Sequence, residues 1–270
     1  MSASIAVSAA SAAPALSAAP ALSAAPALSA APVASETPGA QAIPVVGVPV
    51  VKFLGNVPYE PTWRAMQRFT DERTPATADE IWMVEHPPVF TLGMNGSREH
   101  VLAPGDIPVI DIDRGGQVTY HGPGQLVIYP LIDIRRHALG VRQLVVALEE
   151  AIISYAGELG IAASGSREAP GVYVDGAKLA SIGLRIRRGA TYHGAALNVS
   201  LDLEPFQRIN VCGYRGLAVT RLVDLAGGVG ARATDVRTVA EGLIPHLLRE
   251  MGFSPDQSAI STNLQAVSSR

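Results

Sequence analysis

The 270-residue sequence contains one cysteine, Cys212, so it cannot form an internal disulfide bond. Absence of disulfides is typical of proteins in reducing compartments and predicts a cytoplasmic location. No run of about 20 consecutive apolar residues is present, so we expect no membrane-spanning helix and no membrane partner. The first basic residue is Lys52. The amino-terminal region therefore lacks the cationic segment of a secretory signal and the arginines of a mitochondrial presequence.

Sequence motifs for nucleotides and metals are also absent. No G-x-x-x-x-G-K-[ST] phosphate-binding loop occurs, and Gly228-Val229-Gly230 does not complete a G-x-G-x-x-G fingerprint. The six histidines show no metal-ligand spacing, so we predict neither a metal nor a cofactor. The 21 basic and 24 acidic residues give a net charge of −3, which does not favour a nucleic acid partner. An acyl-transfer enzyme with this sequence should therefore receive an acyl group that is already activated, for example as a thioester.

Composition divides the chain into three regions. Residues 1–45 are rich in alanine, proline and serine, and the hexapeptide S-A-A-P-A-L begins at Ser11, Ser17 and Ser23. Prolines break any helix at each repeat, so we predict a low-complexity, disordered segment whose removal leaves activity unchanged. Residues 46–255 are predicted to form one catalytic domain, and residues 256–270 a polar tail.

The hydrophobic pattern of the central region predicts an α/β domain with a mixed, largely antiparallel β-sheet flanked by helices. A helix is expected to begin with Pro61 in its first position, with Trp63, Met66 and Phe69 on one side. The Asp175-Gly176 pair predicts a tight hairpin turn. Strands and helices do not alternate regularly, so a Rossmann sheet is not expected. Further strands are predicted at Val48–Leu54, Ile81–Val84, Val89–Leu92, Ile107–Ile112, Leu126–Ile132, Val172–Val174 and Ala177–Arg187, and a last helix at Val236–Glu250.

Two further elements have regular apolar stripes. The expected helix over Val141–Leu159 places Val141, Leu144, Val145, Leu148, Ile152, Tyr155 and Leu159 on one face, which predicts that all seven side chains are core residues. The expected strand over Ala195–Leu203 alternates between apolar residues on one face and Asn198, Ser200 and Asp202 on the other. That alternation predicts a half-buried strand.

The tract from Arg114 to Gln125, R-G-G-Q-V-T-Y-H-G-P-G-Q, lies between two apolar runs. It is longer than a plain turn, and its glycines allow the backbone to approach a ligand closely. We interpret it as a binding loop, although an irregular loop or a β-bulge would also contain glycines. Its Thr119-Tyr120-His121-Gly122 recurs as Thr191-Tyr192-His193-Gly194, which predicts two similar strand entrances converging on one pocket.

Lys178 and Cys212 are the residues best suited to chemistry. Lys178 shares its predicted strand face with apolar residues, so it is either at a strand end reaching solvent or buried and useful for proton transfer. A β-bulge at Gly176 would remove this parity argument. Cys212 precedes Gly213 and lies outside any apolar run, which favours an accessible thiol. A thiol needs a cationic neighbour to act as a nucleophile, and Lys178, His121 and His193 are the candidates.

Together these motifs resemble the bacterial octanoyltransferases of protein lipoylation, also called lipoyl(octanoyl) transferases. The resemblance covers roughly Val48 to Glu250. It rests on the ordered set formed by Trp82–Gly93, Arg114–Gln125, Gly176–Gly183, Tyr192–Gly194 and Cys212-Gly213. It implies a fold like the catalytic domains of biotin and lipoate protein ligases.

The resemblance also implies a reaction, in which an octanoyl (or lipoyl) group passes from acyl carrier protein to a specific lysine of a lipoyl domain. Acceptors would be lipoyl domains of 2-oxoacid dehydrogenase subunits and the glycine cleavage H protein. Cys212 would be the nucleophile, and Lys178 would activate the thiol and act as acid and base. Val211 stands where the family usually has proline, which implies a slightly less rigid loop. The acyl pocket would be lined by Arg114, Gly115, Gly116, Gln117, Val118, Thr119, Tyr120, His121, Ser181, Ile182, Gly183, Gly194, Ala195 and Ala196.

Two other functions fit the same fold. An ATP-dependent lipoate or biotin ligase would need no cysteine nucleophile, so Cys212→Ser would leave its transfer intact. A non-catalytic module that binds lipoyl domains would need neither Cys212 nor Lys178. The presence of both residues favours the transferase.

Overall fold

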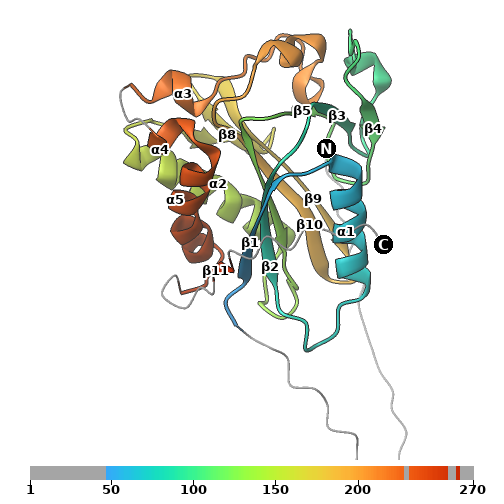
Figure 1. The fold of residues 1–270 in the computed structure, drawn as a ribbon, viewed down its shortest axis with the longest axis vertical. Helices are drawn as coiled ribbons and strands as arrows, with labels where there is room; N and C mark the ends of the chain where they lie inside the picture. Colours follow the sequence, from blue (N-terminus) through green and yellow to red (C-terminus); the bar gives the residue numbers. More distant parts are fainter. Residues whose placement is uncertain (1–46, 228–230, 255–259, 262–270) are drawn as a thin grey trace, which may run out of the picture. The chain divides into compact units, whose positions relative to one another are not determined.

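The computed structural model describes residues 47–227, 231–254 and 260–261 (Figure 1). The predicted disordered segment 1–45 and most of the predicted tail lie outside these residues. The helices are α1 (Tyr59–Asp71), α2 (Val141–Glu158), α3 (Leu222–Leu225), α4 (Ala231–Thr234) and α5 (Val236–Glu250), with 3₁₀ turns η1 (Arg98–His100), η2 (Glu204–Arg208) and η3 (Val211–Gly213). The strands are β1 (Val50–Asn56), β2 (Glu80–Glu85), β3 (Val89–Leu92), β4 (Val109–Asp111), β5 (Val118–His121), β6 (Gln125–Leu131), β7 (Ser164–Gly165), β8 (Gly171–Val174), β9 (Ala177–Arg187), β10 (Ala190–Asn198) and β11 (Ile260–Ser261).

Eight of these strands form one sheet in the order β11-β1-β2-β6-β10-β9-β8-β7, and β4-β3-β5 form a smaller sheet. In the large sheet, β1 pairs in parallel with β11 and β2, and every other pairing is antiparallel. The predicted mixed, largely antiparallel sheet is therefore confirmed. No helix in the described residues is long and apolar enough to cross a membrane.

Helices cover both faces of the large sheet, with α2 and α5 on one side and α1 on the other (Figure 1). Strand β6 shows why, because it is buried along its whole length and its side chains alternate between the two faces. Leu126 and Ile128 pack in the core beneath α2 and α5. Val127 and Tyr129 pack on the opposite face with residues of α1. A strand buried on both faces reads as one continuous apolar run.

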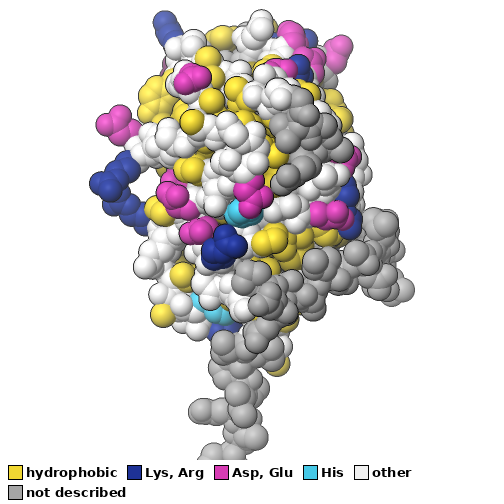
Figure 2. Space-filling model, turned by 90° about the vertical axis from the view of Figure 1, so that its left-hand side faces the viewer, with side chains coloured by type: hydrophobic (Ala, Val, Ile, Leu, Met, Phe, Trp, Pro, Cys, Tyr) yellow, Lys and Arg dark blue, Asp and Glu magenta, His cyan; other side chains and the backbone are white. Residues whose placement is uncertain are grey.

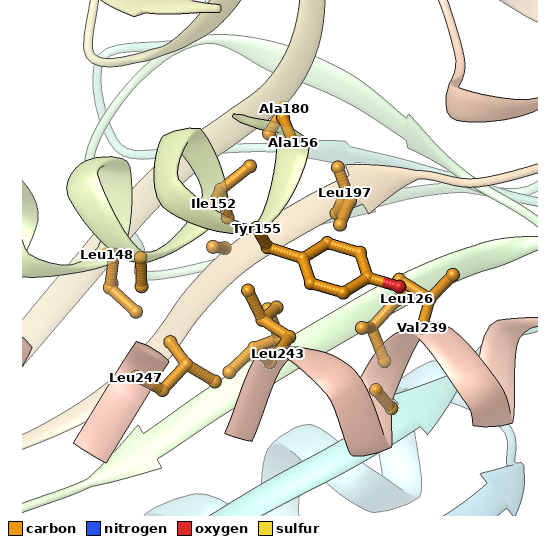
Figure 3. Close-up of a cluster of buried hydrophobic side chains, with 14 of the residues drawn as sticks. Leu126, Leu148, Ile152, Tyr155, Ala156, Ala180, Leu197, Val239, Leu243 and Leu247 are labelled. Atoms are coloured by element: carbon orange, nitrogen blue, oxygen red, sulfur yellow. The ribbon is translucent and has the colours of Figure 1, made fainter. Parts of the chain in front are cut away.

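The core beneath α2 and α5 is centred on Tyr155 (Figure 3). Its ring lies among Leu126 and Leu197 of the sheet and Leu243 of α5 (Figure 3). A Cβ on Gly242 would lie 2.6 Å from this ring, so only glycine allows α5 to approach so closely. Figure 2 shows acidic and basic side chains interspersed with apolar patches on the side of the molecule where these helices lie.

Several predicted elements agree with the structure. Strands β8 and β9 form the predicted hairpin, and Asp175 and Gly176 in its turn have φ values of 48° and 80°, as a type I′ turn requires. Helix α2 ends at Glu158, and Gly160, two residues later, has a φ of 77°. Helix α1 begins at Tyr59 rather than at Pro61, so Pro61 occupies the third position, where a helix N–H still has no intrahelical partner.

The strand predicted over Ala195–Leu203 is wrong in its second half. Strand β10 ends at Asn198, and all its residues are buried, Asn198 included. The backbone N–H groups of Val199, Ser200 and Leu201 all point to the carbonyl oxygen of Gly124, at 2.8–3.1 Å, so the chain turns away from the sheet there. The apolar alternation continues because Leu201 packs into a separate cluster with residues of the small sheet.

The seven-residue stripe of α2 was also predicted too broadly. Val141 is exposed and Val145 is half-buried, whereas the other members of the stripe are buried. Leu144 of the same turn is buried in the core, so Val141 and Val145 lie on the side of the helix that the core does not cover.

Candidate functional site

A cavity of about 400 Å³ opens between the glycine-rich tract, strands β9 and β10, the first turn of α2 and the loop of Cys212. Its apolar wall includes Val127 of β6 and both Val141 and Val145 of α2. Val141 and Val145 are the two members of the α2 stripe that the core does not bury, and here they line the cavity. A concave, largely apolar site with a few convergent polar groups is the usual form of a small-molecule site.

The structure brings most of the predicted site residues to this cavity. Cys212 lines it together with Arg114, Gly115, Gly116, Gln117, Val118, Thr119, His121, Ser181, Ile182, Gly183, Gly194, Ala195 and Ala196. Tyr120 is the exception among the predicted pocket residues. Its ring packs against Phe90 and Phe206 in a separate apolar cluster, because alternation along β5 turns it away from His121.

Glycines allow the tract to lie directly against its neighbours. A Cβ on Gly93 would come 2.3 Å from the carbonyl oxygen of Gly116, and one on Gly183 would come 3.0 Å from that of Gly115. A Cβ on Gly194 would come 1.9 Å from the carbonyl oxygen of Ile128. The cavity wall is therefore backbone packed on backbone, which only glycine permits.

Arg114 is the cation of this cavity. Its guanidinium donates to the carbonyl oxygen of Thr91 at 2.8 Å, to the Thr91 hydroxyl at 3.1 Å and to the carbonyl oxygen of Gly115 at 2.8 Å. Among the described residues, no carboxylate forms an ion pair with it. Burial lowers the pKa of Arg114, and the ionised form of the Cys212 thiol would oppose this effect. Arg114 thus interacts electrostatically with the only thiol of the protein.

A chain of hydrogen bonds holds Arg114 in place from within the same tract. Gln125 donates its amide N–H to other acceptors, so its Oε1 accepts from Nδ1 of His121, at 2.8 Å. Nε2 of His121 is then an acceptor and lies 3.3 Å from the Thr91 hydroxyl, which accepts from Arg114. Burial holds the pKa of His121 well below the ordinary value of histidine, which favours this neutral form. The first and last residues of the tract are therefore coupled.

The same chain continues to the strand that carries Lys178. Gln125 Nε2 donates to Oδ1 of Asn198 at 3.0 Å, and Nδ2 of Asn198 donates to the carbonyl oxygen of Thr220 at 2.9 Å. The backbone N–H of Thr220 in turn binds the carbonyl oxygen of Lys178 at 3.0 Å.

Asp113 organises a second polar network, which the sequence did not predict. It accepts from Nε2 of His193 at 2.9 Å, from Nε1 of Trp63 at 2.8 Å, from Nε2 of Gln67 at 3.1 Å and from the Tyr192 hydroxyl. Burial alone would raise the pKa of this carboxyl, but the hydrogen bonds from His193 and Tyr192 outweigh it and lower the pKa. The only sequence signal was the position of Asp113 next to Arg114.

The two Thr-Tyr-His-Gly copies do converge on one cavity, since His121 and His193 both line it. Their local structures differ, however. His121 ends β5, whereas His193 lies within β10 and has a φ of 57°, a left-handed conformation that is strained for a residue with a Cβ. Because of this conformation, the side chains of His193 and Tyr192 both bind the carboxylate of Asp113, although consecutive residues of a regular strand point to opposite faces.

Cys212 is half-buried in the 3₁₀ turn η3 and has a φ of 54°. The preceding residue, Val211, is buried in the cluster that also contains Ile209. The backbone N–H of Asn210 binds the carbonyl oxygen of His100 at 2.8 Å. Burial of Val211 and this hydrogen bond anchor the loop on its amino-terminal side, where the family usually has proline.

Lys178 is buried, with only 1% of its surface exposed, and it does not line the cavity itself. Its ammonium donates to the hydroxyl of Tyr173 at 2.7 Å and to the carbonyl oxygen of Pro170 at 3.2 Å. Pro170 lines the cavity, so Lys178 lies directly behind the wall. The register between β8 and β9 shifts beside Lys178, leaving Leu179 unpaired, so the predicted strand parity does not apply and burial is decided by packing.

Comparison with known proteins places this site in context. The family model of the lipoyl protein ligase A/B catalytic domain matches residues 58–247. The octanoyltransferase of Chromobacterium violaceum is 57% identical over 207 residues, covering 77% of this chain and 98% of that protein. The octanoyltransferase of Alkalilimnicola ehrlichii is 63% identical over 175 residues, covering 65% of this chain and 81% of that protein.

Solved structures share the fold at low identity. A putative lipoate protein ligase of T. acidophilum superposes with a TM-score of 0.62 at 15% identity, over 80% of this chain and 90% of that chain. A lipoate-protein ligase A bound with ATP superposes with a TM-score of 0.62 at 16% identity, over 80% and 90%. The predicted α/β fold with the architecture of lipoate protein ligases is thereby confirmed.

Proposed function

This chain belongs to the octanoyltransferases, acyltransferases built on the lipoyl protein ligase A/B catalytic domain, and we propose that it transfers octanoyl through a thioester of Cys212. One observation carries this proposal. Cys212, the only thiol in the chain, lines the same cavity as the buried Arg114 and the glycine-rich tract. A nucleophile and a cation therefore share one largely apolar site, as acyl transfer from a thioester requires.

The proposed reaction has two steps. Cys212 Sγ attacks the acyl carbon of octanoyl-acyl carrier protein, an S–C bond forms, and the carrier thiolate leaves with the thiol proton of Cys212. The neutral amine of a lipoyl-domain lysine then attacks this thioester, a C–N bond forms, and Cys212 leaves as thiolate. The proton lost by the amine returns to Cys212. Exchange between thioesters is nearly isoenergetic and amide formation is downhill, so no ATP is consumed.

Two cations have separate proposed roles. Arg114 stabilises the thiolate of Cys212 electrostatically, because its buried charge lies on the same cavity wall and has no carboxylate partner among the described residues. Lys178, which lies behind that wall, moves the proton between the amine and the thiol. The nearby glycine-rich backbone offers N–H donors for the oxyanion of each tetrahedral intermediate.

The acyl chain is proposed to lie along the apolar part of the cavity. Val127, Val141 and Val145 line it together with Ile182 and Leu184. Burial of seven apolar carbons at about 0.8 kcal/mol each would contribute roughly 5 kcal/mol of gross binding energy. The pocket residues predicted from the sequence, other than Tyr120, would form the rest of this site. Lipoyl domains of 2-oxoacid dehydrogenases and the H protein remain the proposed acceptors, and the cytoplasm the proposed compartment.

Mass spectrometry tests the acyl-enzyme directly. Mixing the protein with octanoyl-acyl carrier protein should add one octanoyl group to Cys212, and Cys212→Ser should abolish both the adduct and the transfer. No mass increase on the wild-type protein would refute the thioester. ATP-dependent transfer retained by Cys212→Ser would instead favour a ligase, the reaction of its structural neighbours.

A further inference from the structure

The surroundings of Lys178 Nζ limit how its protons can be arranged. The Tyr173 hydroxyl donates its single proton to the carbonyl oxygen of Ala169, at 2.7 Å. It can therefore only accept from Lys178, at 2.7 Å. Pro170 also offers only an acceptor, its carbonyl oxygen, at 3.2 Å. Two of the N–H bonds of Lys178 are thus directed to fixed acceptors.

The third position on Nζ can hold either a proton or a lone pair without disturbing those two bonds. An ammonium group has three N–H bonds, and a neutral amine has two N–H bonds and one lone pair. Lys178 can therefore gain or lose one proton while its nitrogen stays in the same place. This is the property that a group needs when it carries a proton between a thiol and an amine.

Packing around Lys178 leaves little freedom to move. A Cβ on Gly171 would lie 2.9 Å from Nζ and 2.4 Å from the carbonyl oxygen of Ala180, so Gly171 leaves room for the ammonium. Nζ also lies 4.6 Å from the ring centre of Tyr173. The backbone N–H of Gly171 is bound at 2.8 Å by Glu149, whose buried carboxylate supplies negative charge near Lys178.

The two acceptors of Lys178 line different cavities. Tyr173 lines a second cavity, of about 320 Å³, which shares Glu168, Ala169 and Tyr214 with the cavity of Cys212. The other acceptor of Lys178, Pro170, lines the first cavity. Lys178 therefore lies beneath the Ala169-Pro170 segment, with one partner on each cavity.

We propose that Tyr173 is a positioning residue for octanoyl transfer: its hydroxyl, fixed by Ala169, holds Nζ of Lys178 in the one place from which it exchanges a single proton with the reacting groups. This inference rests on the proposed role of Lys178. Tyr173 itself neither gives nor takes the transferred proton, because its own proton is committed to Ala169.

Tyr173→Phe tests this role, and Tyr155→Phe is the matched control. Both changes delete one hydroxyl, but Tyr155 lies in the core beneath α5, away from the cavities (Figure 3). A hydrogen bond to a charged group contributes about 1.5–3 kcal/mol, so Tyr173→Phe should lower the transfer rate by about tenfold to a hundredfold. It should also displace the pH–rate profile, since the charged form of Lys178 loses an acceptor. Tyr155→Phe should change neither the rate nor the profile.

A double-mutant cycle separates positioning from general damage. If Tyr173 acts only through Lys178, then Tyr173→Phe should have no further effect on the residual rate of Lys178→Ala. A wild-type pH–rate profile in Tyr173→Phe, with transfer lost in Lys178→Ala, would overturn the positioning role alone. A wild-type rate in Lys178→Ala would overturn the proposed function of Lys178 and this inference with it. Additive losses in the double variant would also overturn it.

Discussion

The guanidinium of Arg114 donates to the carbonyl oxygen of Thr91 at 2.8 Å, which fixes a buried positive charge in the wall that also carries Cys212. The sequence offered Lys178, His121 and His193 as cationic neighbours for the thiol. In the structure, His121 and His193 are buried and burial lowers the pKa of each. Both histidines are therefore neutral near pH 7. Lys178 lies behind the wall, so Arg114 is the cation that lines the cavity.

Arg114→Ala should slow transfer by about a hundredfold, the effect of removing one preorganised electrostatic group from a reaction site. It should also move the alkylation of Cys212 by iodoacetamide to higher pH, because the thiolate loses the positive charge that lines the same cavity. Arg249→Ala, which changes an exposed arginine on α5, is the control and should alter neither measurement. An alkylation profile equal to that of the wild type would contradict this role of Arg114 and would favour Lys178 as the residue that stabilises the thiolate.

Gly194→Ala should destabilise the sheet and distort the cavity. The added Cβ would lie 1.9 Å from the carbonyl oxygen of Ile128, so β10 and β6 would have to separate. Overpacking of this kind costs about 1–3 kcal/mol, measurable by urea unfolding. Gly157→Ala on α2 is the matched control, since nothing lies within 4 Å of its added Cβ. It should raise stability by up to about 1 kcal/mol. Equal stability of the two variants would contradict the close approach at Gly194.

Acid should destabilise the protein before its carboxylates titrate. Burial lowers the pKa of His86 to about 4, whereas an unfolded histidine has a pKa of about 6.5. The unfolded state therefore binds protons first as the pH falls below about 6.5, and stability declines until the pH nears 4. This one group should contribute about 3 kcal/mol to the decline. The free energy of unfolding, measured with urea, should differ less between pH 7 and pH 4 in His86→Gln than in the wild type. An equal difference in the two proteins would contradict the burial of His86 as a neutral group.

Asp113 should also contribute to stability, but its contribution should be lost at a lower pH than that of His86. The pKa of Asp113 is lower in the folded protein than in the unfolded chain, where it is about 3.9, because His193, Tyr192 and Trp63 donate to it. Its contribution is complete above about pH 4 and is lost as the pH falls through the folded pKa. The wild type should therefore have a larger free energy of unfolding than Asp113→Asn at pH 7, and this difference should become smaller towards pH 2. A difference that stays constant with pH would show that its charge contributes nothing.

Local sequence patterns predicted the structure correctly where neighbouring residues alone determine it. The Asp175-Gly176 turn needs positive φ at both residues, and α2 needs a continuous apolar stripe, so both are visible in short stretches of sequence. Strand β10 shows the limit of such rules. The alternation through Leu201 and Leu203 suits a strand equally well. The strand nevertheless ends, because the next three backbone N–H groups bind the carbonyl oxygen of Gly124, which is distant in the sequence.

The site shows the same limit. Thr119-Tyr120-His121 was predicted as one pocket segment, yet Tyr120 faces a different cluster, because alternate residues of a strand point to opposite sides. Val141 was predicted to be buried because its spacing matched the stripe of α2. It lines the cavity instead, beside residues of β9 and β10.

By itself the sequence determined the residue types, their order and the family, since one thiol, one glycine-rich tract and the lysine of Gly176–Gly183 occur in a highly specific arrangement. Only the tertiary structure decided which groups meet. Asp113 binds His193 across 80 positions of sequence, and Gln125 binds Asn198 across 73. No local periodicity encodes such contacts. The second depends on the pairing of β6 with β10, and both depend on which buried polar groups find partners in the fold. That is why the sequence predicted Arg114 as a pocket residue and Cys212 and Lys178 as the reactive pair, while only the fold showed that Arg114 is bound to Thr91 and that Tyr173 accepts a hydrogen bond from Lys178.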